Sequence, residues 1–226
     1  MHAGGELTII NFHGIGEPTR LLEPGEAPFW LSRDQFCAVL DRIAARADPH
    51  RFAITFDDSN TSDLTIAVPE LQKRELTATF FILTGRFCSQ GSLDRADVKE
   101  IVASGMDIGS HGIDHRDLTR LSPAELDNEL IRSKIILEDV HSQPVSTVSI
   151  PFGRYNARVL RAIRKAGYSG AYTSDGGSAN KRHFLRPRRS LRCDMSTEHI
   201  EDLLADEATF LSRMHRGVRL VLKRLR

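Results

Sequence analysis

Short apolar runs that alternate with helical patterns constrain this chain more than any other feature of its sequence. The predicted strands are Leu7–Phe12, Phe52–Phe56, Ala78–Leu83, Met106–Ser110, Val145–Ile150, Gly170–Thr173 and a weaker one near Leu185–Leu191. Several runs are continuously apolar, which is typical of parallel strands buried on both faces. About seven β–α alternations predict an α/β fold with a closed or nearly closed (β/α) barrel. A doubly wound open sheet has the same alternation, so periodicity leaves that architecture open.

Helix start and stop signals occupy the segments between these strands. Ser122–Glu125 combines a capping box with proline at the first helical position. Asn156 can cap a second helix, which ends at Gly167. The inner face of the first helix is predicted to consist of Leu126, Leu130, Leu137 and Val140. These signals support helices that cover a central sheet.

Charge, cysteines and the first residues limit the class of protein. The formal net charge of +1 gives no overall field that would favour nucleic acid. Cys37, Cys88 and Cys193 are far apart and form no paired motif, so we expect free thiols. Met1–Leu7 lacks the pattern of a signal peptide, and no apolar run approaches the ~20 residues of a membrane span. These features predict a cytoplasmic protein.

The chain reads as one domain, 1–226, with a core at about 8–204 and a basic C-terminal helix at about 197–226. The helix begins acidic and ends basic, which matches the helix dipole. Its apolar face can dock onto the barrel, or its basic end can contact a membrane surface or partner. Gly14–Pro28 reads as a long loop that follows the first strand, where a barrel places its active site.

Three groups of chemically active residues each follow a predicted strand. Asp57 and Asp58 are adjacent carboxylates that need a cation or a shared proton. His111 and His115, four residues apart, can face the same side of a helical turn and hold one ion. Pro151–Gly153 forms a tight turn that can aim a backbone N–H into a cavity. One carboxylate with two histidines suits Zn²⁺ or a similar ion, and a second carboxylate can act as base.

With these motifs in place, the chain resembles the polysaccharide deacetylase family, the NodB-homology or carbohydrate esterase family 4 group. The resemblance covers roughly Thr8 to Leu204. Its motifs are Thr55–Asp58, the His111 and His115 pair, Asp117–Thr119, Pro151–Gly153, the opening Ile10–Gly14 segment, and Phe29–Ser32 followed by Phe36.

The resemblance implies a distorted (β/α)7-type, NodB-like barrel and a divalent metal ion. Asp58, His111 and His115 would hold that ion, expected to be Zn²⁺, with Co²⁺, Ni²⁺ or Mn²⁺ as alternatives. Asp57 would be the base that takes a proton from the metal-activated water. The Phe152 N–H would stabilise the oxyanion, because proline at 151 has no N–H to donate.

The same resemblance predicts where the sugar is held. His13, Pro151 and Phe152 would lie against the substrate. Trp30 is a further expected contact, because aromatic faces stack on sugar rings and Trp30 ends the long first loop.

Several positions depart from the family pattern. Gly112 stands where the family usually has Ser or Thr, and Ser149 stands where many members have an arginine that orients the catalytic aspartate. We expect Arg188 to reach in from the next strand instead. The family's Asp-x-x-Asp-Trp motif is absent, although Asp175 falls in that region. The late Leu-x-His motif that supplies the general acid is also absent, which leaves His183 and Asp194 as weak candidates.

The predicted function is a metal-dependent hydrolase that removes an acetyl group, expected on nitrogen, from an oligo- or polysaccharide containing N-acetylhexosamine. One alternative is an amidohydrolase of the same fold acting on a non-sugar amide. Another is a carbohydrate-binding relative without catalysis, which the missing acid motif would suit. The expected partner is a carbohydrate and not nucleic acid.

Overall fold

The computed structural model describes residues 6–205 of the chain. Its main sheet has the order β10-β8-β7-β6-β5-β4-β1-β11, and all neighbours along this path are parallel. The strands are β1 (Leu7–Phe12), β4 (Phe52–Phe56), β5 (Ala78–Ile82), β6 (Asp107–Ser110), β7 (Thr147–Ser149), β8 (Gly170–Thr173), β10 (Leu185–Pro187) and β11 (Arg189–Ser190). Off this path, β9 (Ser178–Ala179) pairs antiparallel with β1, and β2 (Gly14–Ile15) pairs with β3 (Trp30–Leu31).

The two ends of the sheet are joined by one short segment of chain. Residues 185–187 pair with β8, and residues 189–190 pair with β1, so the predicted last strand is broken at Arg188. This junction brings the two edges together and gives a barrel-like sheet, which confirms the distorted barrel and excludes the doubly wound open sheet. Arg188 lies at the point where the segment changes partners, with its N–H donating to Thr173 O.

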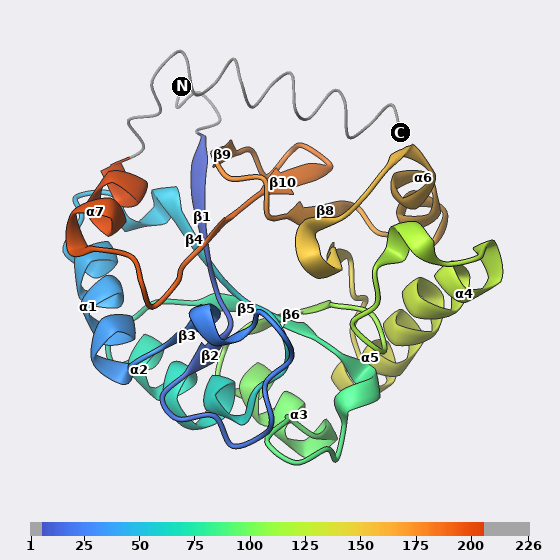
Figure 1. Ribbon diagram of the computed structural model, residues 1–226, viewed down its shortest axis with the longest axis horizontal. Coiled ribbons are helices and arrows are strands. Elements are labelled where there is room, and N and C mark those ends of the chain that lie inside the picture. The colour runs from blue at the N-terminus through green and yellow to red at the C-terminus, as the bar shows by residue number, and fades with distance from the viewer. Residues whose placement is uncertain (1–5, 206–226) are drawn as a thin grey trace.

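Helices form a ring around the sheet (Figure 1). The α-helices are α1 (Arg33–Ala44), α2 (Val68–Gln72), α3 (Arg95–Ala103), α4 (Pro123–Asp127), α5 (Ser133–His141), α6 (Ala157–Lys165) and α7 (Thr197–Ala205). Two π-helical segments, η3 (Asp63–Ala67) and η6 (Asn128–Arg132), continue into α2 and α5. Single 3₁₀ turns are η1 (Ala27–Phe29), η2 (Pro49–Arg51), η4 (Thr84–Arg86), η5 (Leu118–Arg120) and η7 (Pro151–Gly153).

The predicted caps are confirmed. The Ser122 side chain accepts from the Glu125 N–H in a capping box with proline at the first helical position, and Asn156 caps α6 through the Val159 N–H. The four residues predicted to form an inner face are buried: Leu126, Leu130, Leu137 and Val140.

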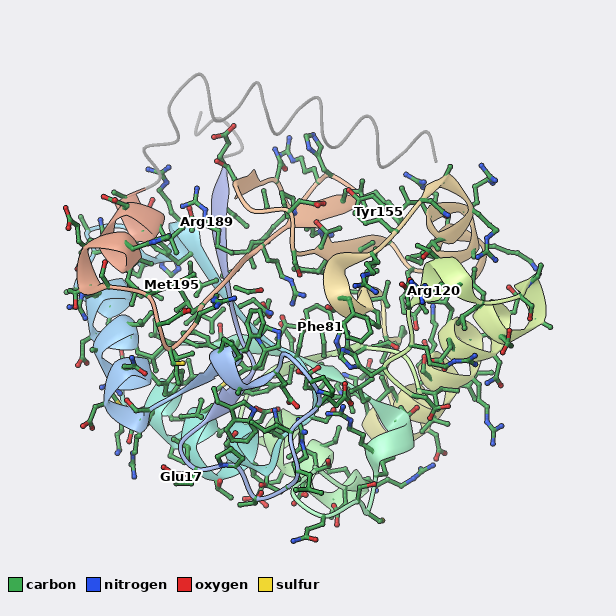
Figure 2. The ribbon with its side chains drawn as sticks, viewed as in Figure 1. Glu17, Phe81, Arg120, Tyr155, Arg189 and Met195 are labelled. Atoms are coloured by element: carbon green, nitrogen blue, oxygen red, sulfur yellow. The ribbon has the colours of Figure 1, made fainter. Side chains whose placement is uncertain are left out.

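Both faces of the sheet are buried, as the continuous apolar runs predicted. Phe80 points outward into the core beneath the helices, where its ring stacks 4.6 Å from that of Phe56. Phe81, its neighbour, points into the barrel, where its ring lies 4.8 Å from that of Tyr172 (Figure 2). Alternate side chains of β5 therefore serve two separate cores.

The C-terminal prediction is only partly covered by the structure. Helix α7 begins at Thr197 as expected, while the basic stretch 206–226 lies outside the described residues. Between residues 6 and 205, no helix has both the length and the apolar character required to cross a bilayer. Cys37, Cys88 and Cys193 are free thiols, as predicted.

Candidate active site

The chemically active residues meet at the carboxyl ends of the parallel strands. Asp57 and Asp58 follow β4, His111 follows β6, and the turn containing Phe152 follows β7. Together with His13 after β1, these residues line a cavity of about 400 Å³. In parallel barrels this edge is where catalytic residues gather, because each strand delivers one loop to the same face.

Asp58, His111 and His115 form a compact set of metal-ligand atoms. Asp58 Oδ1 lies 3.5 Å from His111 Nε2 and 3.5 Å from His115 Nε2. The three ligand atoms lie within 4.8 Å of one another. Asp58 Oδ1 is buried and accepts no hydrogen bond from residues 6–205. Because a buried carboxylate oxygen is costly without a partner, this geometry fits a divalent cation.

Each histidine is oriented through its other ring nitrogen. His111 Nδ1 lies 3.0 Å from the Ser149 carbonyl oxygen, and His115 Nδ1 lies 3.2 Å from Glu23 Oε2. Both contacts suit an Nδ1–H donor, which would leave each Nε2 unprotonated and facing Asp58. This is the usual second contact of a metal-binding histidine.

The histidine pair does not lie on a helical turn, so that part of the prediction is wrong. Residues 111–117 form an irregular loop. The two imidazoles converge because Gly112 has φ +91° and His115 has φ 52°, which bend the loop back on itself. The spacing of four residues is therefore satisfied by left-handed backbone and not by helical periodicity.

Asp57 is held by a buried network centred on Arg188. The Arg188 guanidinium is fully buried and contacts both carboxylate oxygens, at 2.9 Å and 2.7 Å. Ser149 Oγ donates to Asp57 Oδ2 at 3.2 Å and accepts from Arg188 Nη2 at 2.7 Å. Asn11 Nδ2 also donates to Asp57 Oδ2, at 3.2 Å. The small serine at position 149 thus leaves space for an arginine that arrives from the barrel junction.

The pKa values of the two aspartates reflect these neighbours. Burial alone would raise the pKa of Asp57, but the charge of Arg188, followed by that of His111, lowers it to about 2. Burial also opposes ionisation of Asp58, yet His111, His13 and His115 hold its pKa below the ordinary range. Both carboxylates are therefore ionised at neutral pH.

The two histidines respond differently to the same carboxylates. Burial lowers the pKa of His111, but Asp57 and Asp58 outweigh it and the pKa is raised. For His115, burial outweighs the attraction of Asp58, and its pKa is lowered.

The expected substrate contacts are placed unequally. Phe152 lines the cavity with its side chain half exposed and its ring centroid 4.3 Å from that of His115. His13 also lines it, and its Nδ1 is buried without a hydrogen bond within the described part of the chain. Pro151 is buried beneath the turn. Trp30 does not reach the cavity, because its ring packs where a side chain at Gly14 would otherwise lie, and Phe29 lines the cavity instead.

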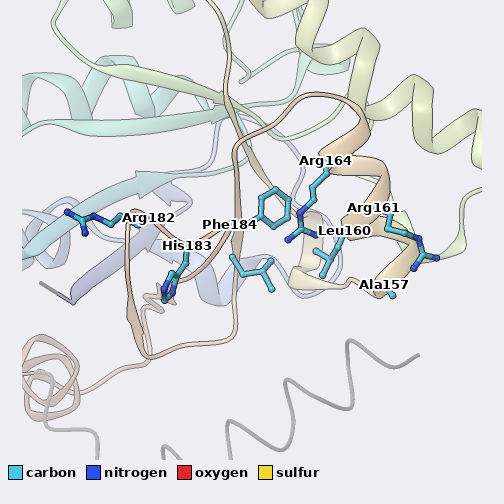
Figure 3. A pocket seen from close by; sticks show the side chains of 8 residues that line it. Ala157, Leu160, Arg161, Arg164, Arg182, His183 and Phe184 are labelled. Carbon is cyan, nitrogen blue, oxygen red and sulfur yellow. The ribbon is translucent and has the colours of Figure 1, made fainter. Parts of the chain in front are cut away.

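The two candidates for the general acid, His183 and Asp194, lie away from this cavity, and so does Asp175. His183 lines a different pocket, between α6 and the segment that leads into β10, and Arg164 and Phe184 also line that pocket (Figure 3). Asp175 accepts hydrogen bonds from Tyr155 Oη and Thr173 Oγ1, both at 2.8 Å. Asp194 pairs with Arg192 on the surface. None of the three is among the residues that line the catalytic cavity.

Two polar residues of the site were not anticipated from the sequence. Asn11 interrupts the apolar run of β1, which was a usable signal for a buried polar role. Glu23 lies in the long loop after β1 and reaches His115 from there, although the sequence offers no local sign of that contact.

Comparison with known proteins identifies the family. The model of the polysaccharide deacetylase family matches residues 44–171, which is more than half of the chain. The chain therefore belongs to the polysaccharide deacetylase family. The match spans both the Asp57–Asp58 pair and the histidine loop.

Two relatives agree with this assignment. YxkH of Bacillus subtilis (strain 168) is 31% identical over 160 residues, which is 71% of this chain and 54% of YxkH. The peptidoglycan-N-acetylglucosamine deacetylase PgdA of Listeria monocytogenes is 32% identical over 114 residues, 50% of this chain and 24% of PgdA. The chain thus spans about half of one relative and a quarter of the other.

The fold of the polysaccharide deacetylase domain is also found in Streptococcus pyogenes deacetylase PplD, solved in complex with acetate. The two structures superpose with a TM-score of 0.76 at 24% sequence identity, over 92% of this chain and 100% of PplD. At this identity the likeness establishes the fold alone.

Proposed function

We propose that this chain hydrolyses acetyl groups, on nitrogen, from an oligo- or polysaccharide that contains N-acetylhexosamine, with one divalent ion, Zn²⁺, as cofactor. The observation that carries the proposal is the convergence of Asp58 Oδ1, His111 Nε2 and His115 Nε2 beside Asp57. Membership of the family supports the reaction class. The similarity to PgdA, whose name specifies N-acetylglucosamine in peptidoglycan, supports the sugar.

Asp58, His111 and His115 would hold the ion. When bound, the ion would supply Lewis acidity and lower the pKa of a water molecule toward ~7. The protein's part is to present one carboxylate and two unprotonated Nε2 atoms in a buried pocket. Ser149 O and Glu23 keep the two imidazoles in the required orientation.

Asp57 is the proposed general base, which takes the proton from the water that attacks the acetyl carbon. Its pKa of about 2 keeps the carboxylate ionised at neutral pH, so neither of its oxygens carries a proton before the reaction. Arg188 is the proposed positioning residue for Asp57. A guanidinium that engages both oxygens fixes the rotation of the carboxylate, which a single hydrogen bond would not do.

The turn after β7 is the proposed oxyanion site. The Gly153 and Arg154 N–H groups donate to Ile150 O and Pro151 O, and proline at 151 has none, so Phe152 supplies the N–H of this turn. Phe152 has φ 56°, a conformation that a bulky residue adopts only under constraint, and such constraint is common at functional sites.

The leaving nitrogen must receive a proton, and His13 is the proposed donor. It lines the cavity and is a histidine outside the candidate metal set, and its ring lies 4.8 Å from Phe29. His183 and Asp194, considered from the sequence, lie elsewhere.

Mass spectrometry of acetylated oligosaccharides tests this function. Zn²⁺-loaded protein is incubated with N-acetylglucosamine oligomers, and each turnover is expected to remove 42 Da, about the mass of one acetyl group exchanged for hydrogen. Small non-sugar N-acetyl amides are assayed in parallel. If only the small amides are cleaved, the substrate is a non-sugar amide and not an acetylated sugar. Glycan binding without acetate release, in a protein that takes up no metal ion, would indicate a non-catalytic relative.

A further inference from the structure

The loop that carries both histidines is tied to the neighbouring helix by one buried carboxylate. Glu129 is 1% exposed, and its Oε2 accepts hydrogen bonds from the Ile113 N–H at 2.6 Å and the Asp114 N–H at 3.3 Å. Both donors lie between His111 and His115. A carboxylate placed on two successive backbone N–H groups is a strong, charge-assisted contact in a buried setting.

The opposite edge of the same loop is also bonded. Gly112 O and Ile113 O accept from the Thr84 and Gly85 N–H groups, at 3.2 Å and 3.0 Å. Glu129 therefore completes the loop's backbone pairing on the side that faces the helix. Without its carboxylate, the N–H groups of two residues would have to find water in a crowded region.

Glu129 reaches the loop because the helix contains a π-helical segment at that point. Two carbonyl groups of η6 have side-chain partners: Glu129 O accepts from the Ser133 side chain at the start of α5, and Leu130 O accepts from Tyr168 Oη at 2.9 Å. Backbone acceptors released by the altered helical pattern thus have partners, which stabilises the bulge. The bulge allows both Glu129 and Leu130 to point inward.

The glycine at position 112 fits the same interaction. A Cβ at Gly112 would lie 2.8 Å from Glu129 Oε2, and Gly112 has φ +91°. A Ser or Thr at this position, as in the family pattern, would meet the carboxylate. Gly112 and Glu129 therefore depend on each other, because the absence of a side chain at position 112 leaves room for the carboxylate that fixes the loop.

We infer that Glu129 is a positioning residue for the metal site, which sets the separation of the two histidines by fixing the backbone between them. The inference rests on the proposed metal-dependent function, but the contact that carries it exists without the ion. The sequence held one signal for it: a glutamate three residues after Leu126, on the otherwise apolar face of the predicted helix.

Zn²⁺ affinity and amide exchange of the Glu129→Ala variant test the inference. Competition with a chromophoric chelator is expected to show Zn²⁺ binding weakened about 10- to 100-fold. In the metal-free protein, the Ile113 and Asp114 amides are expected to exchange at least about tenfold faster. Glu129→Gln keeps one acceptor oxygen and should lose less than about tenfold in affinity.

The control variant is Leu137→Ala, which removes a fully buried side chain of α5 and lowers the melting temperature without touching the loop. Its Zn²⁺ affinity and its Ile113 and Asp114 exchange should match those of the unmodified protein. A double-mutant cycle adds a second test. Gly112→Ala should weaken Zn²⁺ binding in the unmodified protein, and this loss should be at least about threefold smaller in the Glu129→Ala variant.

Failure of this inference and failure of the proposed function give different results. If the unmodified protein binds Zn²⁺ tightly and Glu129→Ala changes neither affinity nor exchange, the positioning role is wrong and the function stands. If the unmodified protein binds no divalent ion, the proposed function is wrong, and with it the role of Glu129 at a metal site.

Discussion

The two halves of the candidate site are built on different principles. Asp57, Asp58 and His111 have side chains no more than 5% exposed. Arg188 holds Asp57, and His111 Nδ1 contacts the carbonyl oxygen of Ser149 in β7. His115 has a side chain 12% exposed, and it is held by Glu23, whose side chain is 45% exposed. The first half is fixed by the barrel itself, while the second depends on the loop after β1.

This difference separates the tasks of the site. The proposed base, Asp57, and its proposed positioning residue, Arg188, lie where side chains have little freedom, as proton transfer requires. The exposed half, which includes Phe152 and Glu23, borders the cavity that the proposed carbohydrate substrate would enter. Changes in the buried half should therefore alter both folding and rate, whereas changes in the loop half should alter metal affinity with little loss of stability.

The largest effect is expected for Asp57→Asn. Loss of the proposed general base should lower kcat/KM for an N-acetylglucosamine oligomer at least about 10³-fold. Zn²⁺ content should stay within a few-fold, because Asp58 and both histidines remain. Asp114→Asn is the matched control, since it changes an exposed carboxylate of the histidine loop. Turnover within tenfold of the unmodified protein would remove Asp57 from the mechanism.

Arg188→Met should cause the largest loss of stability. The free energy of unfolding should fall by about 3–5 kcal/mol, because the Asp57 carboxylate stays buried without its partner. Chemical denaturation measures this loss, and Asp57→Asn in the same chain should restore part of it. Arg186→Met, in the same segment but partly exposed, should cost less than about 1 kcal/mol. Equal losses of stability for the two arginine variants would show that the buried Arg188–Asp57 pair contributes no more to stability than a partly exposed arginine does.

How far the sequence predicts this molecule depends on whether a feature is local. Strands, helix caps and inner helical faces follow from patterns within about ten residues, so they were found. The junction at Arg188 was not, because two short pairings with opposite edges of the sheet depend on register across the whole barrel. Arg188 itself was expected near Asp57 only through the resemblance to a family.

The site divides in the same way. Asp57, Asp58 and the histidines are found from strand ends and short spacings. Glu23 and Glu129 contact the histidine loop across 92 and 16 residues of sequence. No short pattern predicts the Glu23 contact, and a glutamate on an otherwise apolar helix face marks Glu129 without naming its partner. Trp30 was expected at the substrate from its chemistry alone, yet its ring packs into the space that the missing side chain of Gly14 leaves.

The dependence of stability on pH should reveal the buried half. The pKa of Asp57 is lowered from 3.8 to about 2 in the folded protein, so its contribution is complete above pH 4. That contribution, about 2 kcal/mol, is lost as the pH falls from about 4 toward 2, because the unfolded chain binds the proton first. The free energy of unfolding, measured by chemical denaturation at each pH in this range, should fall less steeply with decreasing pH for Asp57→Asn. Parallel curves would mean that Asp57 is not held by Arg188 in solution.

The smallest effect, and the sharpest test of the loop half, is expected for Glu23→Gln. The glutamine loses the charge that orients His115 through Nδ1, so Zn²⁺ affinity should fall about tenfold. The free energy of unfolding should change by less than about 0.5 kcal/mol, because Glu23 lies on an exposed loop. Glu17→Gln, an exposed residue of the same loop (Figure 2), is the control and should leave both quantities unchanged. A large loss of stability with unchanged affinity would reverse the contrast, since the loop would then support the fold and not the metal site.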